Sequence, residues 1–98
     1  MSSLRSGPEC VQVEGDFSDI DYAQFEHALD ELRRSTVKTP RVDLSAVSFL
    51  TSRAIGMLVA LWVDLVEQGR WFNLQASDQA WRALEKAGVA RVFFQRPA

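Results

Sequence analysis

The sequence predicts an α/β domain built on a mainly parallel or mixed sheet of about four strands with three main helices. Two observations predict this class: the order of the elements along the chain, and the capping residues that bound the helices. Strand-like and helix-like stretches alternate three times, an order that favours parallel strands joined by right-handed crossovers. Because 98 residues is the length of one domain, we expect a single domain over residues 9–98. Residues 1–8, in which only Leu4 is strongly apolar, are expected to form a disordered tail.

The first strand and the first helix are expected before residue 35. Val11 and Val13 alternate with polar residues, as in a short half-buried strand. Ser18, followed three residues later by Asp21, resembles a capping box and predicts a helix over residues 19–34. Its apolar residues recur at spacings of three and four, which predicts one buried face. These residues are Tyr22, Phe25, Leu29 and Leu32.

A second strand and a long helix follow in the middle of the chain. Residues 41–44 alternate as a strand does, and the apolar run over residues 47–50 can extend it. From Ser52 the pattern becomes helical over residues 53–68, and Gly69 stands where a left-handed residue often closes a helix.

The third strand and helix complete the predicted order. Residues 71–76 form the strand, and Ser77 or Asp78 can cap a helix over residues 78–87 that ends at Gly88. Residues 92–94 are expected to add a last extended piece. The three tryptophans lie at positions compatible with the core, so buried packing is their expected role. They are Trp62, Trp71 and Trp81.

The composition argues against several classes of function. The net charge is −2 and the basic residues are scattered, so the sequence predicts no basic patch that would bind a phosphate backbone. No nucleic-acid partner is therefore expected. The most apolar stretch, residues 54–66, contains Asp64 and is shorter than the roughly 20 residues that span a bilayer, so no membrane insertion is expected. The single cysteine, Cys10, cannot form an internal disulfide, and no secretion signal is visible. A cytoplasmic location fits these features.

No catalytic or metal-binding constellation is visible, so we expect no enzymatic activity, no metal and no cofactor. His27, the only histidine, fits the polar side of a helix, and no orienting partner or second ligand can be named. Cys10 precedes a strand, where it is expected to be a small structural residue. The carboxylates of Asp16, Asp19 and Asp21 crowd a helix start, where negative charge is favourable.

The most informative segment runs from Asp43 to Gly56 and reads DLSAVSFLTSRAIG. It resembles the core motif of STAS domains, in which a strand reading DLSxVxF leads into an Asp-Ser-Ser-Gly-Leu-Gly type loop at a helix start. The resemblance covers about residues 9–94. It implies a non-catalytic partner-switching regulator similar to anti-sigma factor antagonists. The implied partners are an anti-sigma factor or related serine kinase domain, with a phosphatase as a further partner.

The resemblance also implies a site of regulation. In the antagonists of this family, the serine that matches Ser52 is phosphorylated by a partner kinase, and phosphorylation disrupts the complex. Thr51 stands where the family has Asp, and Arg53 and Ala54 replace the usual Ser and Gly. Thr51 is therefore an alternative acceptor of the phosphate. A second branch of the family has Asp-Thr-Gly-Gly at this loop and serves as a cytoplasmic accessory subunit of lipid-transport ABC complexes, which is the alternative function.

The helix start at Ser52 permits two physical interpretations. The hydroxyl can be an ordinary N-cap, which stabilises a helix by about 1 kcal/mol. It can also carry a phosphate, which would meet unpaired N–H groups and the Arg53 guanidinium. The apolar arc of the helix is wider than packing on one sheet requires. Either a neighbouring helix buries the rest of the arc, or it forms an exposed apolar patch that a partner covers. Gly56 suggests a close approach. The expected partner-binding residues are Thr51, Ser52, Arg53, Ile55, Gly56, Val59 and Val63.

Overall fold

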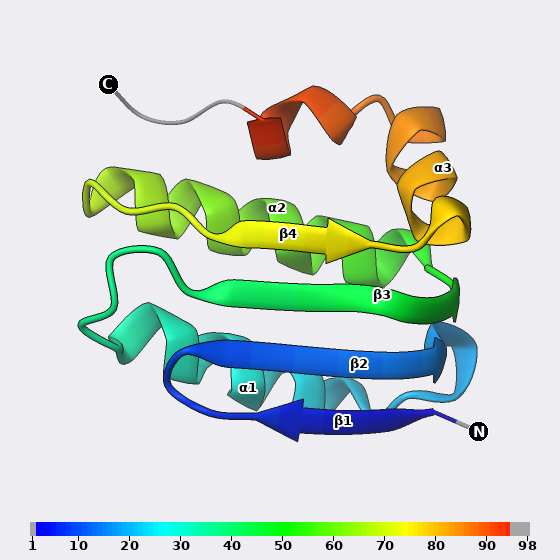
Figure 1. Cartoon of the computed structure of the whole chain (residues 1–98), viewed down its shortest axis with the longest axis horizontal. Helices are drawn as coiled ribbons and strands as arrows, with labels where there is room; N and C mark the ends of the chain where they lie inside the picture. The colour runs from blue at the N-terminus through cyan, green and yellow to red at the C-terminus, as the bar shows by residue number, and fades with distance from the viewer. Residues whose placement is uncertain (1, 95–98) are drawn as a thin grey trace.

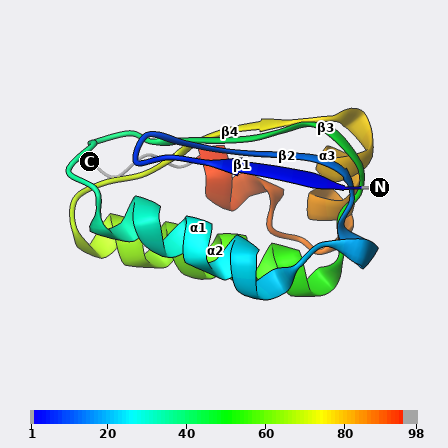
Figure 2. The ribbon, with the colours of Figure 1, turned by 90° about the horizontal axis from the view of Figure 1, so that it is seen from below.

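Four strands form one mixed sheet, and two long helices cover one of its faces (Figures 1 and 2). The computed structural model describes residues 2–94. The strands, in their order across the sheet, are β1 (Ser3–Ser6), β2 (Cys10–Asp16), β3 (Arg41–Phe49) and β4 (Asn73–Ala76). β1 is antiparallel to β2, whereas β2, β3 and β4 are parallel to their neighbours.

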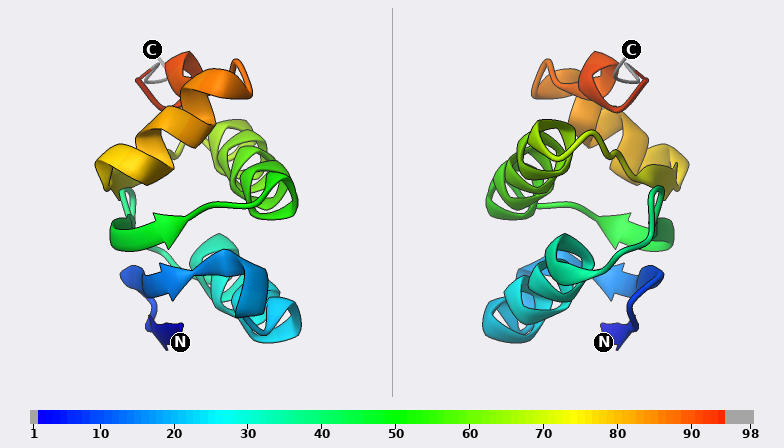
Figure 3. Two further views of the ribbon diagram at one scale, coloured as in Figure 1. Left: turned by 90° about the vertical axis from the view of Figure 1, so that its right-hand side faces the viewer. Right: turned by 90° about the vertical axis from the view of Figure 1, so that its left-hand side faces the viewer.

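The helices lie behind the sheet and at one end of it. α1 (Tyr22–Arg34) and α2 (Ser52–Glu67) lie side by side on one face, and α3 (Asp78–Lys86) packs near the end of β3 (Figures 2 and 3). Two 3₁₀ turns, η1 (Phe17–Asp19) and η2 (Ala90–Phe94), complete the described chain. The expected α/β class, with a mixed four-stranded sheet and three main helices, is confirmed. Within residues 2–94, no helix has the length and apolar character needed to cross a membrane.

The expectation of a disordered tail is wrong for residues 3–6, which form β1. Leu4 lies opposite Val13 of β2 and packs against the core, while Ser3 and Arg5 are exposed. A four-residue edge strand with one apolar side chain has too little alternation to be recognised from its sequence.

The start of α1 also differs from the expectation. Asp21, rather than Ser18, caps the helix, because its carboxylate accepts the Gln24 N–H at 3.2 Å. Residues 17–19 form η1 instead, and Asp16 caps this turn by accepting the Ser18 N–H at 2.7 Å. The helix therefore begins three residues later than the capping-box pattern suggested.

The other boundaries follow the expected pattern more closely. β3 joins the two predicted runs into one strand and ends one residue before the second run does, and β4 begins two residues later than expected. Gly69 and Gly88 have φ of 72° and 76°, so both adopt the left-handed conformation expected after a helix. Ser77 caps α3 by accepting the Ala80 N–H. The expected extended piece at residues 92–94 is wrong, because these residues belong to η2.

The core lies between the sheet and the helices. Trp62 of α2 is buried and makes edge-to-face contacts with Phe72 and Phe93, at centroid distances of 5.2 and 5.7 Å. The contact with Phe93 shows why η2 turns back over the core rather than extending. Trp71 and Trp81 are only half-buried, so full burial holds for one of the three tryptophans.

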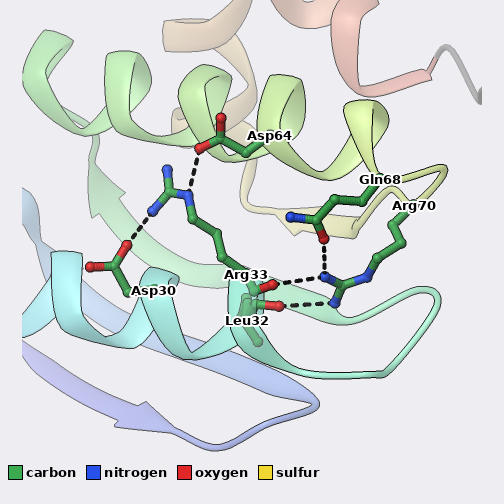
Figure 4. Close-up of polar contacts among 6 residues, drawn as sticks. All are labelled: Asp30, Leu32, Arg33, Asp64, Gln68 and Arg70. Carbon is green, nitrogen blue, oxygen red and sulfur yellow. Dashed lines mark hydrogen bonds and ion pairs between the residues drawn. The ribbon is translucent and has the colours of Figure 1, made fainter.

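Two arginines fix α1 against α2 at the end of α1 (Figure 4). Arg70 is 8% exposed, and its guanidinium donates to the carbonyl oxygens of Leu32, Arg33 and Val37 at 2.8–3.0 Å. Arg33 bridges the helices: it donates to Asp30 of α1 and to Asp64 of α2, both at 2.7 Å. These bonds hold the two helices side by side, and this arrangement places their N-termini together at the opposite end.

Candidate functional site

The parallel strands β2, β3 and β4 all end at the same edge of the sheet, on the right in Figure 1, which we call the carboxyl edge. The chain leaves β2 into η1, leaves β3 into the start of α2, and leaves β4 into α3. Both α1 and α2 begin at this edge. The loop singled out by the sequence therefore lies where ligands and partners commonly meet an open α/β sheet.

Thr51 and Ser52 have different roles at the start of α2. Thr51 is the N-cap, and its hydroxyl accepts the Ala54 N–H at 3.2 Å. The same hydroxyl is hydrogen-bonded to the Tyr22 hydroxyl of α1. Ser52 is the first residue of the helix; it is exposed, and its hydroxyl has no hydrogen-bond partner among the described residues. The N-cap interpretation of Ser52 is therefore wrong, and the capping hydroxyl is that of Thr51.

Arg53 connects the starts of the two helices. Its guanidinium carbon lies 4.3 Å from the centroid of the Tyr22 ring, which is a cation–π geometry. Arg53 is itself exposed. Tyr22, the first residue of α1, thus contacts α2 twice, through its hydroxyl at Thr51 and through its ring at Arg53.

The carboxylates at this edge lie at the starts of η1 and α1, where they stabilise these elements. The hydrogen bonds that the backbone N–H and the hydroxyl of Ser18 donate to Asp16 lower the pKa of that carboxyl below its ordinary value. Asp16 and Asp21 are caps, as the helix-start interpretation predicted, and Asp19 lies in the first turn of η1. Among residues 2–94, no group of three His, Cys, Asp or Glu side chains is placed to hold a metal ion.

An exposed apolar surface extends from Ser52 along α2. Gly56 and Ala60 are exposed, Val63 and Val66 are 48% and 37% exposed, and Val59 is half-buried. We call these five residues, which share the side of the helix turned away from the sheet, the outer face of α2. The exposed residues of α1 differ in character, since most of them are polar. They include Gln24, Glu26, His27 and Arg34.

The structure differs from the predicted surface at two residues. Ile55, expected to contact a partner, is only 8% exposed and belongs to the core, so its side chain is not available. Phe49, which sequence reasoning did not select, is 52% exposed at the end of β3, next to the carboxyl edge. Its position at the end of an alternating strand was the only signal, and alternation does not say whether a terminal residue is covered.

The remaining chemically active side chains lie elsewhere. His27 is exposed on α1, with its Nε2 3.3 Å from a Glu31 oxygen, as expected of a surface residue. Cys10 is half-buried at the start of β2. Cavities of about 260 and 430 Å³ open around Glu9 and Cys10, at the opposite end of β2 from the carboxyl edge.

The architecture is the STAS fold, which the motif after Asp43 predicted. A crystal structure of an anti-sigma factor antagonist from Mycobacterium paratuberculosis superposes with a TM-score of 0.77 and 22% identity, covering 100% of this chain and 86% of that one. The anti-sigma factor antagonist SpoIIAA, solved in its unphosphorylated form, superposes with a TM-score of 0.69 and 16% identity over 93% of this chain and 84% of that one. No family model matches the sequence. A search of curated proteins also finds no match. This protein thus shares the fold of anti-sigma factor antagonists.

Proposed function

We propose that this protein is a non-catalytic partner-switching regulator of the anti-sigma factor antagonist type. In this proposal it binds an anti-sigma factor or related serine kinase domain in the cytoplasm, and phosphorylation of Ser52 releases the partner. The observation that carries the proposal is that Ser52 is exposed, has no hydrogen-bond partner for its hydroxyl among the described residues, and lies beside an exposed apolar helix face. The fold shared with two anti-sigma factor antagonists supports it.

Ser52 is a better phosphate acceptor than Thr51 for a geometric reason. The Thr51 hydroxyl is half-buried, caps α2 and is bonded to Tyr22. A kinase that modified Thr51 would first have to break both interactions, whereas Ser52 is accessible as it stands. The transfer forms a bond between Ser52 Oγ and the γ-phosphorus of ATP, breaks the bond from that phosphorus to the ADP oxygen, and passes the hydroxyl proton to a base of the kinase.

The surface around Ser52 explains how a phosphate would act on binding. A partner that covers the outer face of α2 removes Val63 and Val66 from water, which favours association. A phosphate on Ser52 carries nearly two negative charges, and the partner would have to desolvate them. In the free protein the same phosphate faces the positive end of α2, where anions are tolerated. Phosphorylation should therefore weaken binding without unfolding the domain.

Affinity purification from the native cell, followed by measurement of binding to the captured protein, tests this function. We expect the parent and Ser52→Ala to capture an anti-sigma factor or kinase domain, and Ser52→Asp to bind it at least about tenfold more weakly, which corresponds to about 1.4 kcal/mol. Val63→Asp should weaken binding similarly, because it charges the outer face of α2. Gln24→Asp, an exposed change on α1, is the matched control and should bind as the parent does.

The site of modification is tested with the captured kinase and ATP. Trypsin cleaves after Arg41 and Arg53, so both candidate hydroxyls fall in peptide 42–53, and fragment ions must place the phosphate. We expect it on Ser52. If neither hydroxyl is modified and Ser52→Asp binds as tightly as the parent, the proposal is wrong. Capture of permease and ATPase subunits would instead support the role of accessory subunit in an ABC complex.

A further inference from the structure

The Tyr22 side chain contacts both residues that flank Ser52. Its hydroxyl is hydrogen-bonded to the Thr51 hydroxyl, and its ring lies against the Arg53 guanidinium. Ser52 stands between them, and its hydroxyl has no hydrogen-bond partner in the part of the chain that the structure describes. Any group added to Ser52 is therefore placed next to an existing contact between α1 and α2.

Of these two contacts, the one between Arg53 and Tyr22 is the one that a phosphate on Ser52 can disturb. Arg53 is exposed, so burial does not hold its guanidinium over the ring. A cation–π contact at an exposed position is weak, whereas a guanidinium and a phosphate form short, charge-assisted and often bidentate hydrogen bonds. The guanidinium is carried on a long flexible side chain adjacent to Ser52, so it can reach either the ring or the phosphate.

We propose that Arg53 senses phosphorylation of Ser52 by leaving the Tyr22 ring and pairing with the phosphate. This inference rests on the proposed function, because it takes Ser52 as the modified residue. The exchange has two consequences. The positive charge of Arg53 is neutralised at the carboxyl edge, and one face of the Tyr22 ring becomes uncovered. The Thr51 cap and its bond to Tyr22 stay in place, so the fold does not change.

The composition of the chain makes this exchange measurable. Tyr22 is the only tyrosine, so a protein labelled with ring-¹³C tyrosine gives NMR signals from this ring alone. Phosphoserine can be placed at position 52 during translation, which avoids the need for a kinase. Arg53→Gln removes the guanidinium but keeps most of the side-chain stem, and it defines where the Tyr22 signals lie when the ring is uncovered. Arg34→Gln, an exposed change at the far end of α1, is the control.

We expect phosphoserine at position 52 to move the Tyr22 signals toward their positions in Arg53→Gln. In the Arg53→Gln background the same phosphoserine should move them much less, while in the Arg34→Gln background it should move them as in the parent. The ³¹P signal should also titrate at a lower pH in the parent than in Arg53→Gln, because the guanidinium favours the dianion. Tyr22 signals that ignore the phosphate, or that move equally without Arg53, would overturn the inference.

This test needs no partner, so its result is separate from that of the binding experiment. If phosphoserine at position 52 abolishes partner binding but leaves the Tyr22 ring unaffected, the proposed function stands and Arg53 is not the sensor. If the ring responds and partner binding does not, Arg53 responds to the phosphate but the proposed function is wrong.

Discussion

Gly56→Ala should make the protein more stable while it weakens partner binding. Gly56 lies inside α2 and is exposed, and a Cβ added there would meet no atom within 4 Å. The glycine therefore serves no close approach to any of residues 2–94. Alanine is favoured over glycine in a helix interior by about 0.8–1.0 kcal/mol, because glycine loses more backbone entropy on folding. The free energy of unfolding should rise by that amount.

Thermal and urea unfolding measure this change. For a domain of this length, 1 kcal/mol corresponds to a shift of roughly 4–8 °C in Tm, which far-UV circular dichroism resolves easily. Ala60→Gly is the matched control, since Ala60 is exposed one turn further along the same helix. It should lower stability by about as much as Gly56→Ala raises it.

A measurement of partner affinity tests whether Gly56 allows a close approach by the partner. If the partner backbone approaches the outer face of α2 closely at Gly56, the added methyl group should reduce affinity although stability rises. A Gly56→Ala protein that is more stable and binds the captured partner as the parent does would show that no such approach exists. A protein that is less stable would refute the helix-propensity argument itself.

Two further predictions concern stability alone. Thr51→Ala should lower the free energy of unfolding by about 1–2 kcal/mol, because it removes the α2 cap and the hydrogen bond to Tyr22. Ser52→Ala should change the free energy of unfolding by less than about 0.5 kcal/mol. Equal effects of the two variants in urea unfolding would contradict the assignment of the cap to Thr51. Arg70→Met should lower the free energy of unfolding by about 2–4 kcal/mol, because the Arg33 and Val37 carbonyls lose a charged donor. Arg34→Met, at an exposed position, serves as the control. A decrease below about 1 kcal/mol for Arg70→Met would show that water replaces the guanidinium.

Local signals predicted the elements that have clear caps. The helices expected over residues 53–68 and 78–87 are observed as Ser52–Glu67 and Asp78–Lys86, because Gly69 and Gly88 end them in the left-handed conformation. β1 and η2 were missed or misassigned, because their structure depends on distant partners. β1 needs β2 beside it, and η2 needs Trp62 beneath Phe93.

At the candidate site too, local sequence signals predicted some residues, while others depend on distant neighbours. The motif located Ser52 and the helix that follows it, but spacing alone could not separate the buried Ile55 from the half-buried Val59 or the exposed Val63. All three lie on one apolar arc, and tertiary neighbours decide which of them is covered. The sequence did not predict the role of Arg70, because the backbone carbonyls that accept from it lie 33–38 positions earlier in the chain. Only its bond to the Gln68 side chain is local.

The antiparallel direction of β1 has a practical consequence for experiments on this protein. Ser3 pairs with Glu14, so the chain enters the sheet at the carboxyl edge, the same edge that carries Ser52 (Figure 1). An affinity tag joined ahead of β1 would emerge there and could shield the surface under study. The turn at Gly7–Pro8 lies at the opposite end of the sheet, with Gly7 only lightly packed. Immobilisation through that turn, or removal of an N-terminal tag before binding is measured, would leave the carboxyl edge open to solvent.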